Sequence, residues 1–425
     1  MSIKNQLTQL TKNKTTDFRF IPFIVVLFYI LTLFFSEFYF GSYAVVGKHF
    51  ALHPQPYFVD LKILLCGIDA IRDNINPYEI NCDNTIPYFN YPITWGFLAP
   101  LPFITVPNVL YIGICLALCF FTSLYFFIGK INFLEAIIYS FLFISPAVML
   151  GPERGNSDLI IFLLLLIPIL KTAFQRLFPI IILFCSLLKL FPIAAIMGIF
   201  HRARNNTKNA LIIFLSVGLM FLFYIILMRD NILMVSKKTP RPYRDFSYGL
   251  GGIPSIFIDH FPSEKTSIYI LLPVLMILGF FLFHILTIKQ WRTLKFSEDK
   301  YGLSYIAGSS IFVTTCLIGH NWEYRLIFLL FAIPQILKWI LEKKQFAFLL
   351  LILVMLILWQ SFIGNILSKL PLNVHYSLIS QLFVVILFYC LLSILLNFTK
   401  ETLNKVQPLF FTKKNHEVKY SNTSI

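Results

Sequence analysis

Long apolar stretches alternate with short polar ones along almost the whole chain. A helix that crosses the hydrocarbon core of a membrane needs roughly 17–25 mostly apolar residues. Runs of about this length occur at 20–43, 107–129, 133–150, 209–229, 267–288, 301–319, 324–341, 346–363 and 377–398, and a shorter one occupies 157–170. The pattern therefore predicts an all-α polytopic membrane protein.

The apolar stretch 178–200 differs from the others because Lys189 and then Pro192 interrupt it. As a single crossing, it would place the basic cluster 201–208 on the same side as the loop 44–92. As two short helices folded back at Lys189, it returns that cluster to the side of the N-terminus. A polar residue followed closely by Pro is typical of a helix break. We therefore expect the hairpin, which gives about 12 membrane helices and places both chain ends in the cytosol.

Basic residues concentrate on one of the two sides that this arrangement defines. The segments expected inside are 1–19, 130–132, 171–177, 201–208, 289–300, 338–345 and 399–425, and those expected outside are 44–92, 151–156, 229–266, 320–325 and 364–376. The inner segments hold 22 Lys and Arg in 84 residues, whereas the outer segments hold 12 in 112. Cytosolic loops of membrane proteins carry such an excess. We expect a cytosolic segment 1–19, a transmembrane domain 20–398 and a basic cytosolic tail 399–425.

The composition agrees with this class and excludes others. Hydrophobic residues make up 58% of the 425 residues and charged residues 13%, whereas soluble domains have about 45–50% and about 25%. This excludes a soluble enzyme, a secreted disulfide scaffold and a disordered protein, and it assigns the net charge of +15 to membrane orientation rather than to nucleic-acid binding. The inner loops contain no GxxxxGK[ST] phosphate loop, which argues against a nucleotide-driven pump. Cys66 and Cys82 share the large outer loop and could form a disulfide in an oxidising compartment.

Acidic residues concentrate on the outer side, which places the candidate chemistry there. Of 20 Asp and Glu, 12 lie in or beside the outer segments. In the loop 44–92, the apolar residues around Asp60 are spaced as in an amphipathic helix that lies on the membrane surface. Such a helix would hold the Asp60 carboxylate at the level of the lipid headgroups, with Lys62, Tyr78 and Tyr91 in the same loop. A solvated acidic loop is the alternative.

A second outer cluster contains Glu153, Arg154, Gly155, Asn156 and Asp158. Gly155 suits a tight turn, and Asn156 suits the cap of the following helix. Neither role explains an Arg beside a Glu at the membrane edge. An Arg next to the free N–H groups of a helix start is typical of an anion site.

The third cluster is the Leu-Lys-Leu-Phe-Pro segment around Lys189. An ionisable side chain inside an apolar run is costly, and it is usually functional or paired. The alternative is that Lys189 extends to the membrane surface, as Lys does near helix ends. In the expected hairpin, Lys189 lies at the outer tip, close to the other clusters.

The fourth cluster comprises His320, Asn321, Trp322, Tyr324 and Arg325, with Glu323 among them. We expect it to open a helix, because the spacing of four between Asn321 and Arg325 then places both on one face. The two aromatic residues alone would suit an interface belt, but the charged residues exceed what a belt needs. The basic residues of the outer loop 229–266 suggest an anionic partner, with a solvated loop as the alternative.

Taken in order, these segments resemble a known family of enzymes. An outer Asp soon after the first helix (Asp60), an Asn-Pro-Tyr motif and a Tyr-Pro start to the next apolar run are followed by Glu-Arg-Gly-Asn-Ser-Asp, Leu-Lys-Leu-Phe-Pro and Asn-Trp-Glu-Tyr-Arg. This order, over about residues 60–330, is similar to that of glycosyltransferase family 87. That family comprises membrane transferases of the GT-C fold, related to polyprenol-dependent mannosyltransferases.

The resemblance implies a fold, a reaction and roles for individual residues. The fold would be a GT-C-like bundle of about 12 transmembrane helices with short surface helices in the first outer loop. The donor would be a polyprenyl-phosphate sugar, the transfer would invert the anomeric centre, and no metal or other cofactor would be needed. Asp60 would be the catalytic base, Arg154, Lys189 and Arg325 would bind the donor phosphate, and His320 would belong to the same pocket.

Together with the predicted topology, the resemblance implies a hexosyltransferase, multi-pass in a bacterial inner membrane, with its active site outside. The rest of the substrate pocket would comprise Glu153, Asn156, Asp158, Asn321, Tyr78, Tyr91 and Lys62. Its partners would be the lipid-linked donor, a lipid or glycan acceptor and membrane lipid, without nucleic acid. Two other functions stay open: a lipid or glycan transporter, for which a charge beside a helix break is typical, and a surface-polysaccharide polymerase or ligase, which the loop 229–266 suggests.

Overall fold

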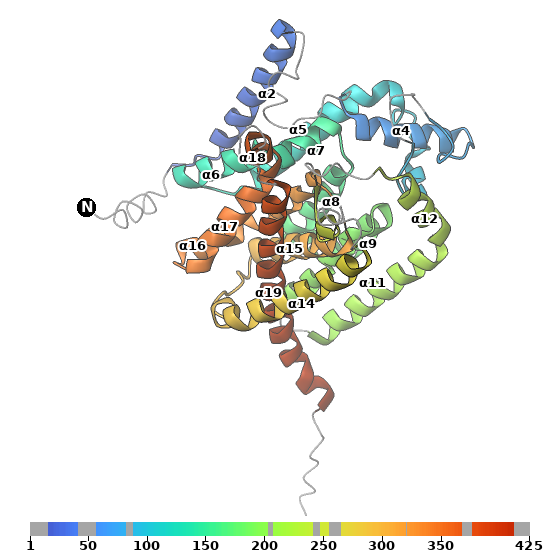
Figure 1. The fold of residues 1–425 in the computed structure, drawn as a ribbon. Helices are drawn as coiled ribbons and strands as arrows, with labels where there is room; N and C mark the ends of the chain where they lie inside the picture. Colours follow the sequence, from blue (N-terminus) through green and yellow to red (C-terminus); the bar gives the residue numbers. More distant parts are fainter. Residues whose placement is uncertain are drawn as a thin grey trace, which may run out of the picture.

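The computed structural model describes residues 16–40, 57–81, 88–202, 207–240, 247–254, 265–319, 321–367 and 376–411. These residues are almost entirely helical (Figure 1). One antiparallel pair is the exception, in which β1 (Ser247–Tyr248) pairs with β2 (Asn321–Trp322). The expected class, an all-α protein with apolar helices long enough to cross a membrane, is confirmed.

Five helices of the described part are long and apolar enough to cross a membrane by themselves. They belong to α5 (Val109–Ile128), α11 (Thr207–Leu227), α14 (Lys265–Trp291), α15 (Lys300–Ile318) and α19 (Tyr376–Phe411). Four bent pairs raise the number of candidate crossings to as many as nine in these residues. The expected number of about 12 stays a prediction.

The bent pairs explain why several apolar runs are not single straight helices. The pairs are α6 (Phe133–Phe143) with α7 (Pro146–Arg154), α8 (Asp158–Leu170) with η3 (Thr172–Leu177) and α9 (Phe178–Leu188), η7 (Glu323–Phe331) with α16 (Ile333–Leu341), and α17 (Gln345–Leu358) with α18 (Gln360–Leu367). The first pair bends by 55° at Ser145, which is extended because Pro146 follows it. The second pair bends by 118° and forms a hairpin.

The expected helix break at Lys189 is confirmed. α9 ends at Leu188, Lys189 is extended, and η4 (Phe191–Met197) continues into α10 (Gly198–Arg202) while packing against α9. The last carbonyls of a helix lack partners within the helix. Here the side chains of Thr94 and Tyr224 donate to the carbonyl of Leu187, and the Trp95 indole donates to that of Leu188. The break is therefore held in place by three hydrogen bonds from other elements.

The helix expected around Asp60 is present as α4 (Val59–Arg72), but it is buried within the protein rather than exposed along one face. Ten of its 14 residues are buried, on all sides of the helix. It packs against α5, α7 and the 3-10 helix η1 (Ile93–Leu98), and η2 (Val106–Asn108) lies beside it. Cys66 of α4 is part of a disulfide whose partner lies outside the described residues. The expected exposed face is wrong because neighbouring elements cover it, which the local pattern does not reveal, and the position on the membrane surface stays a prediction.

The remaining helices divide into central and peripheral ones. Of the candidate spans, α15 has 78% of its apolar window buried, whereas α14 has none, so α14 lies at the periphery, where it packs against α19. Figure 1 shows α15 near the centre of the bundle, with α8, α9 and α19 around it. α2 (Phe20–Phe40) packs against α6, and α12 (Arg229–Lys238) follows α11. α19 continues as a helix to Phe411, past the boundary expected at residue 398.

Candidate functional site

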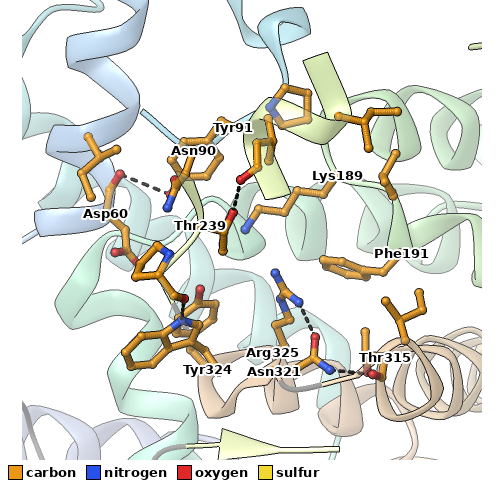
Figure 2. A pocket seen from close by; sticks show the side chains of 18 of the residues that line it. Asp60, Asn90, Tyr91, Lys189, Phe191, Thr239, Thr315, Asn321, Tyr324 and Arg325 are labelled. Carbon is orange, nitrogen blue, oxygen red and sulfur yellow. Dashed lines mark hydrogen bonds between the residues drawn. The ribbon is translucent and has the colours of Figure 1, made fainter. Parts of the chain in front are cut away.

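A cavity of about 240 Å³ lies where the four charged clusters of the sequence meet (Figure 2). Its walls come from α4, from the chain before η1, from the break after α9, from α12, and from the segment that joins α15 to η7. Six residues expected in the site line it, namely Asp60, Tyr91, Arg154, Lys189, Asn321 and Arg325. The structure thus brings together the carboxylate and the three cations that were expected to converge.

Asp60 and Arg154 form a bidentate ion pair at one side of the cavity. Arg154 Nε lies 3.0 Å from Asp60 Oδ2, and Arg154 Nη2 lies 2.6 Å from Oδ1. The side-chain amide of Asn156 donates to the same Oδ2 at 2.5 Å. Parallel N–H···O bonds fix orientation as well as adding energy. Asp60 is therefore held rigidly, with its carboxylate facing the cavity.

Lys189 and Arg325 share a single carboxylate, that of Asp158. The Lys189 ammonium hydrogen-bonds to Oδ1 of this fully buried residue, and Arg325 Nε lies 3.6 Å from Oδ2. Figure 2 shows both cationic side chains extending toward the same space from different elements. Asn156 links the two pairs, because its Oδ1 accepts from Lys189 Nζ at 3.2 Å.

The charges in and directly behind the cavity do not balance. Asp60 neutralises Arg154, whereas Asp158 faces both Lys189 and Arg325. Counted by formal charge, these five described residues carry one excess positive charge in a largely buried place. Because a buried uncompensated charge is costly, the arrangement favours a bound anion between Lys189 and Arg325.

Arg325 and Asn321 are in contact as expected, but not on one helix. Arg325 donates to the side-chain oxygen of Asn321, whose amide donates to the carbonyls of Thr315 (2.6 Å) and Gly319 (3.1 Å). Asn321 belongs to strand β2, and the helix η7 begins only at Glu323. The expected helix does begin within this segment, at Glu323, but the placement of Asn321 on it is wrong, because pairing with β1 keeps the backbone of Asn321 extended.

Aromatic rings face all three cations. Arg154 lies 5.4 Å from the Trp322 ring centroid, Lys189 lies 5.4 Å from that of Tyr91, and Arg325 lies 5.2 Å from that of Phe191. Such contacts stabilise a cation by about 0.5–2 kcal/mol each. Burial raises the pKa of Tyr91 well above its ordinary value. Its phenol therefore stays neutral, and it donates to the backbone carbonyl of Asp60 at 3.4 Å.

Several expected site residues do not line the cavity. Asn156 and Asp158 lie directly behind it, where they hold the residues that do. Tyr78 is buried and donates to the Tyr91 carbonyl at 3.0 Å, so it supports the wall from outside. Glu153 and Lys62 are placed outside the cavity wall, and the Glu153 carbonyl accepts from the backbone N–H preceding α4. His320 lies outside the described residues.

The sequence reasoning missed one wall entirely. Ile232 and Val235 of α12 and the following Thr239 and Pro240 line the cavity. In the sequence analysis we considered only the basic residues of this segment, although the apolar residues at 232 and 235 share a helix face. Asn90, Phe191, Thr315, Trp322 and Tyr324 also line the cavity without having been assigned to it.

A second, larger cavity of about 500 Å³ lies at the opposite end of α15. It is lined by Asp17, Lys130, Asp299 and Lys338, all from segments expected to be cytosolic, and by Glu135 at the start of the apolar run 133–150. Among the described residues, no group of three His, Cys, Asp or Glu is placed to hold a metal ion. Comparisons of the chain with family models, with curated proteins and with solved structures find no match.

Proposed function

We propose that the protein is a membrane glycosyltransferase that moves a sugar from a polyprenyl-phosphate donor to the hydroxyl of a lipid or glycan acceptor. The observation that carries this proposal is the shared counter-ion. Two cations, Lys189 and Arg325, face one carboxylate and leave one positive charge available to an anion. This anion site lies beside a second carboxylate, Asp60, that also faces the cavity.

The anion in this proposal is the phosphate of the donor. When the bond between the anomeric carbon and the phosphate oxygen breaks, its electron pair goes to that oxygen, where negative charge grows. Preorganised cations stabilise such a leaving group more than they stabilise the ground state. Arg325 suits bidentate contact with phosphate and Lys189 acts as a point charge. Both are tethered, by Asp158 and Asn321, before a substrate arrives.

Asp60 takes the role of general base. Its carboxylate accepts three hydrogen bonds, two at Oδ2 and one at Oδ1. A carboxylate oxygen offers two lone pairs, so one lone pair of Oδ1 remains for the acceptor hydroxyl. The hydroxyl gives its proton to Asp60, and its oxygen attacks the anomeric carbon from the face opposite the phosphate. A single displacement of this kind inverts the anomeric centre.

The proposed side of the membrane is the extracytoplasmic one. A disulfide at Cys66 supports this assignment, because disulfides persist in oxidising compartments. The surplus of Lys and Arg in the segments expected inside supports it as well. A GT-C-like architecture and a bacterial inner membrane belong to the same proposal. The resemblance to glycosyltransferase family 87 is consistent with it, since the segments that carry the resemblance meet at the cavity.

Incubation of the purified protein with a panel of polyprenyl-phosphate sugars and glycan or lipid acceptors tests the proposal. Mass spectrometry should detect an acceptor that is one hexose heavier, together with free polyprenyl phosphate. Movement of an intact lipid-linked sugar across vesicle membranes without covalent change would instead identify a transporter. Transfer of a whole glycan chain in one step would identify a polymerase or ligase.

A further inference from the structure

The cavity opens sideways onto an apolar part of the protein surface. Ile318, the last residue of α15, lines the cavity, yet its side chain is 68% exposed. The preceding Leu317 is 57% exposed. Because α15 is a candidate membrane span that ends at Ile318, the inside of the cavity and the lipid-facing surface meet at this helix end.

The helix α12 forms the other side of the opening. Ile232 and Val235 face the cavity, whereas the intervening Leu233 and Met234 are 48% and 39% exposed. No residue of α12 is buried, although the helix is apolar on both of these faces. It is therefore a thin wall with the cavity on one side and exposed apolar side chains on the other.

Two contacts near the end of α12 tie this wall to the rest of the site. The Trp322 indole donates to the Pro240 carbonyl at 3.4 Å, and the Lys238 ammonium lies 4.0 Å from the Tyr88 ring centroid. Both contacts lie at the C-terminal end of α12, on the side of Tyr88 and Trp322. The Ile232–Val235 stretch carries no such polar tie in the described residues.

The cavity is thus charged at one end and apolar at the other. Lys189 and Arg325 supply the charged end, and Ile232, Val235 and Ile318 supply apolar surface at the opening. A ligand with an anionic headgroup and a long hydrocarbon chain matches both ends. Each methylene group that moves from water to apolar surroundings contributes about 0.8 kcal/mol, so the chain must find an apolar path out of the cavity.

We propose that the isoprenoid chain of the donor leaves the cavity between α12 and the C-terminal turn of α15. Its first isoprene units contact Ile232, Val235 and Ile318, and the remainder lies in the membrane beside Leu317. This inference rests on the proposed function for the identity of the lipid. It adds the route by which that lipid enters and the residues that recognise its chain.

Photo-crosslinking tests the route independently of sugar transfer. The full-length protein, reconstituted in lipid nanodiscs, is irradiated with a polyprenyl monophosphate that carries a diazirine on its first isoprene units, and the crosslinked peptides are sequenced. The route predicts adducts in 229–238 and 314–318 that excess unlabelled polyprenyl phosphate removes. Competed adducts confined to other elements, or no competed adducts, would overturn it.

Chain-length selectivity provides the second test. Val235→Trp and Ile318→Trp place an indole in the path of the chain, and Leu233→Trp, on the neighbouring exposed position, is the matched control. The ratio of kcat/KM for an undecaprenyl-phosphate donor to that for a donor with a methyl group in place of the isoprenoid chain should fall about tenfold in the first two variants, because only the isoprenoid chain passes these residues, and it should stay unchanged in the control. An unchanged ratio in all three refutes the route, whereas absence of transfer by the wild type refutes the proposed function and leaves the crosslinking to decide the route.

Discussion

Gly155 lies directly against Leu61, so closely that a Cβ atom on Gly155 would stand 2.8 Å from the Leu61 Cβ. Gly155 also has a φ of +60°, which favours glycine. The contact joins the turn after Arg154 to the residue after Asp60. The bidentate ion pair of the site therefore depends on a glycine that allows α4 and α7 to approach.

Replacing Gly155 by Ala should destabilise the protein and weaken activity together. A strained backbone position typically costs about 1–3 kcal/mol, and relief of the clash would push α4 away from Arg154. Thermal unfolding in detergent and a transfer assay measure the two effects. Gly218→Ala in α11 is the matched control, since nothing lies within 4 Å of its added Cβ. Equal melting temperatures for the two variants would contradict the role of this contact.

Removal of the Lys189 charge should reduce turnover more than any other change to the anion site. Loss of one preorganised charge-stabilising group typically costs about 10²–10³ in kcat, and we expect this range for Lys189→Met. The variant leaves the buried Asp158 with Arg325 as a balanced pair, so its stability should change little.

Asp158→Asn is the matched variant for stability. It leaves both Lys189 and Arg325 without their carboxylate, so unfolding measurements should show a loss of about 3–5 kcal/mol that Lys189→Met does not show. Lys338→Met, in the second cavity, is the control for loss of a lysine and should leave kcat unchanged. A near-normal kcat in Lys189→Met would contradict the role of Lys189 in turnover.

Tyr78 should make stability fall at high pH. Burial raises the pKa of Tyr78 to about 12, above the ordinary value of about 10. A raised folded pKa stabilises the native state fully below about pH 10, and this contribution is lost as the pH rises toward 12. Thermal unfolding from pH 9 to 12 should therefore decline less steeply for Tyr78→Phe than for the wild type. Parallel curves would contradict this assignment.

The proposed orientation of the cavity in the membrane predicts which cysteine variants a membrane-impermeant reagent can label. Glu79 and Lys130 are both exposed, but they belong to the side of the candidate site and to the side of the second cavity, respectively. A membrane-impermeant maleimide should label Glu79→Cys in intact cells and Lys130→Cys only after permeabilisation. The reverse pattern would place the candidate site in the cytosol.

Features that depend on local composition could be predicted from the sequence. Apolar runs define the helices because a membrane-spanning helix requires only sufficient length and an apolar composition, and the sequence shows both. The break at Lys189 follows from a polar residue before Pro192, and the turn at Gly155 follows from the conformational freedom of glycine. To predict that Asp60, Arg154, Lys189 and Arg325 converge, the number of membrane crossings between them was needed as well.

Features that depend on distant partners could not be predicted. The choice of Asp158 as the shared counter-ion requires knowing that α8 begins beside the α9 break. The extended backbone at Asn321 depends on Tyr248, which precedes it by more than 70 positions. The burial of α4 likewise depends on α7 and η1. In each case the local pattern was compatible with two arrangements, and packing selected one.

The central claim is that the Asp60 carboxylate takes the proton of the acceptor hydroxyl while the cations hold the donor phosphate. Single-turnover transfer of one hexose by Asp60→Asn, compared with the wild type and with Asp73→Asn at the exposed end of the same helix, tests it most directly. General-base catalysis contributes about 10²–10⁴ in rate, so Asp60→Asn should lose this factor while still binding the polyprenyl-phosphate sugar, and Asp73→Asn should match the wild type. A folded Asp60→Asn protein that transfers the sugar at a near-normal rate would contradict the account.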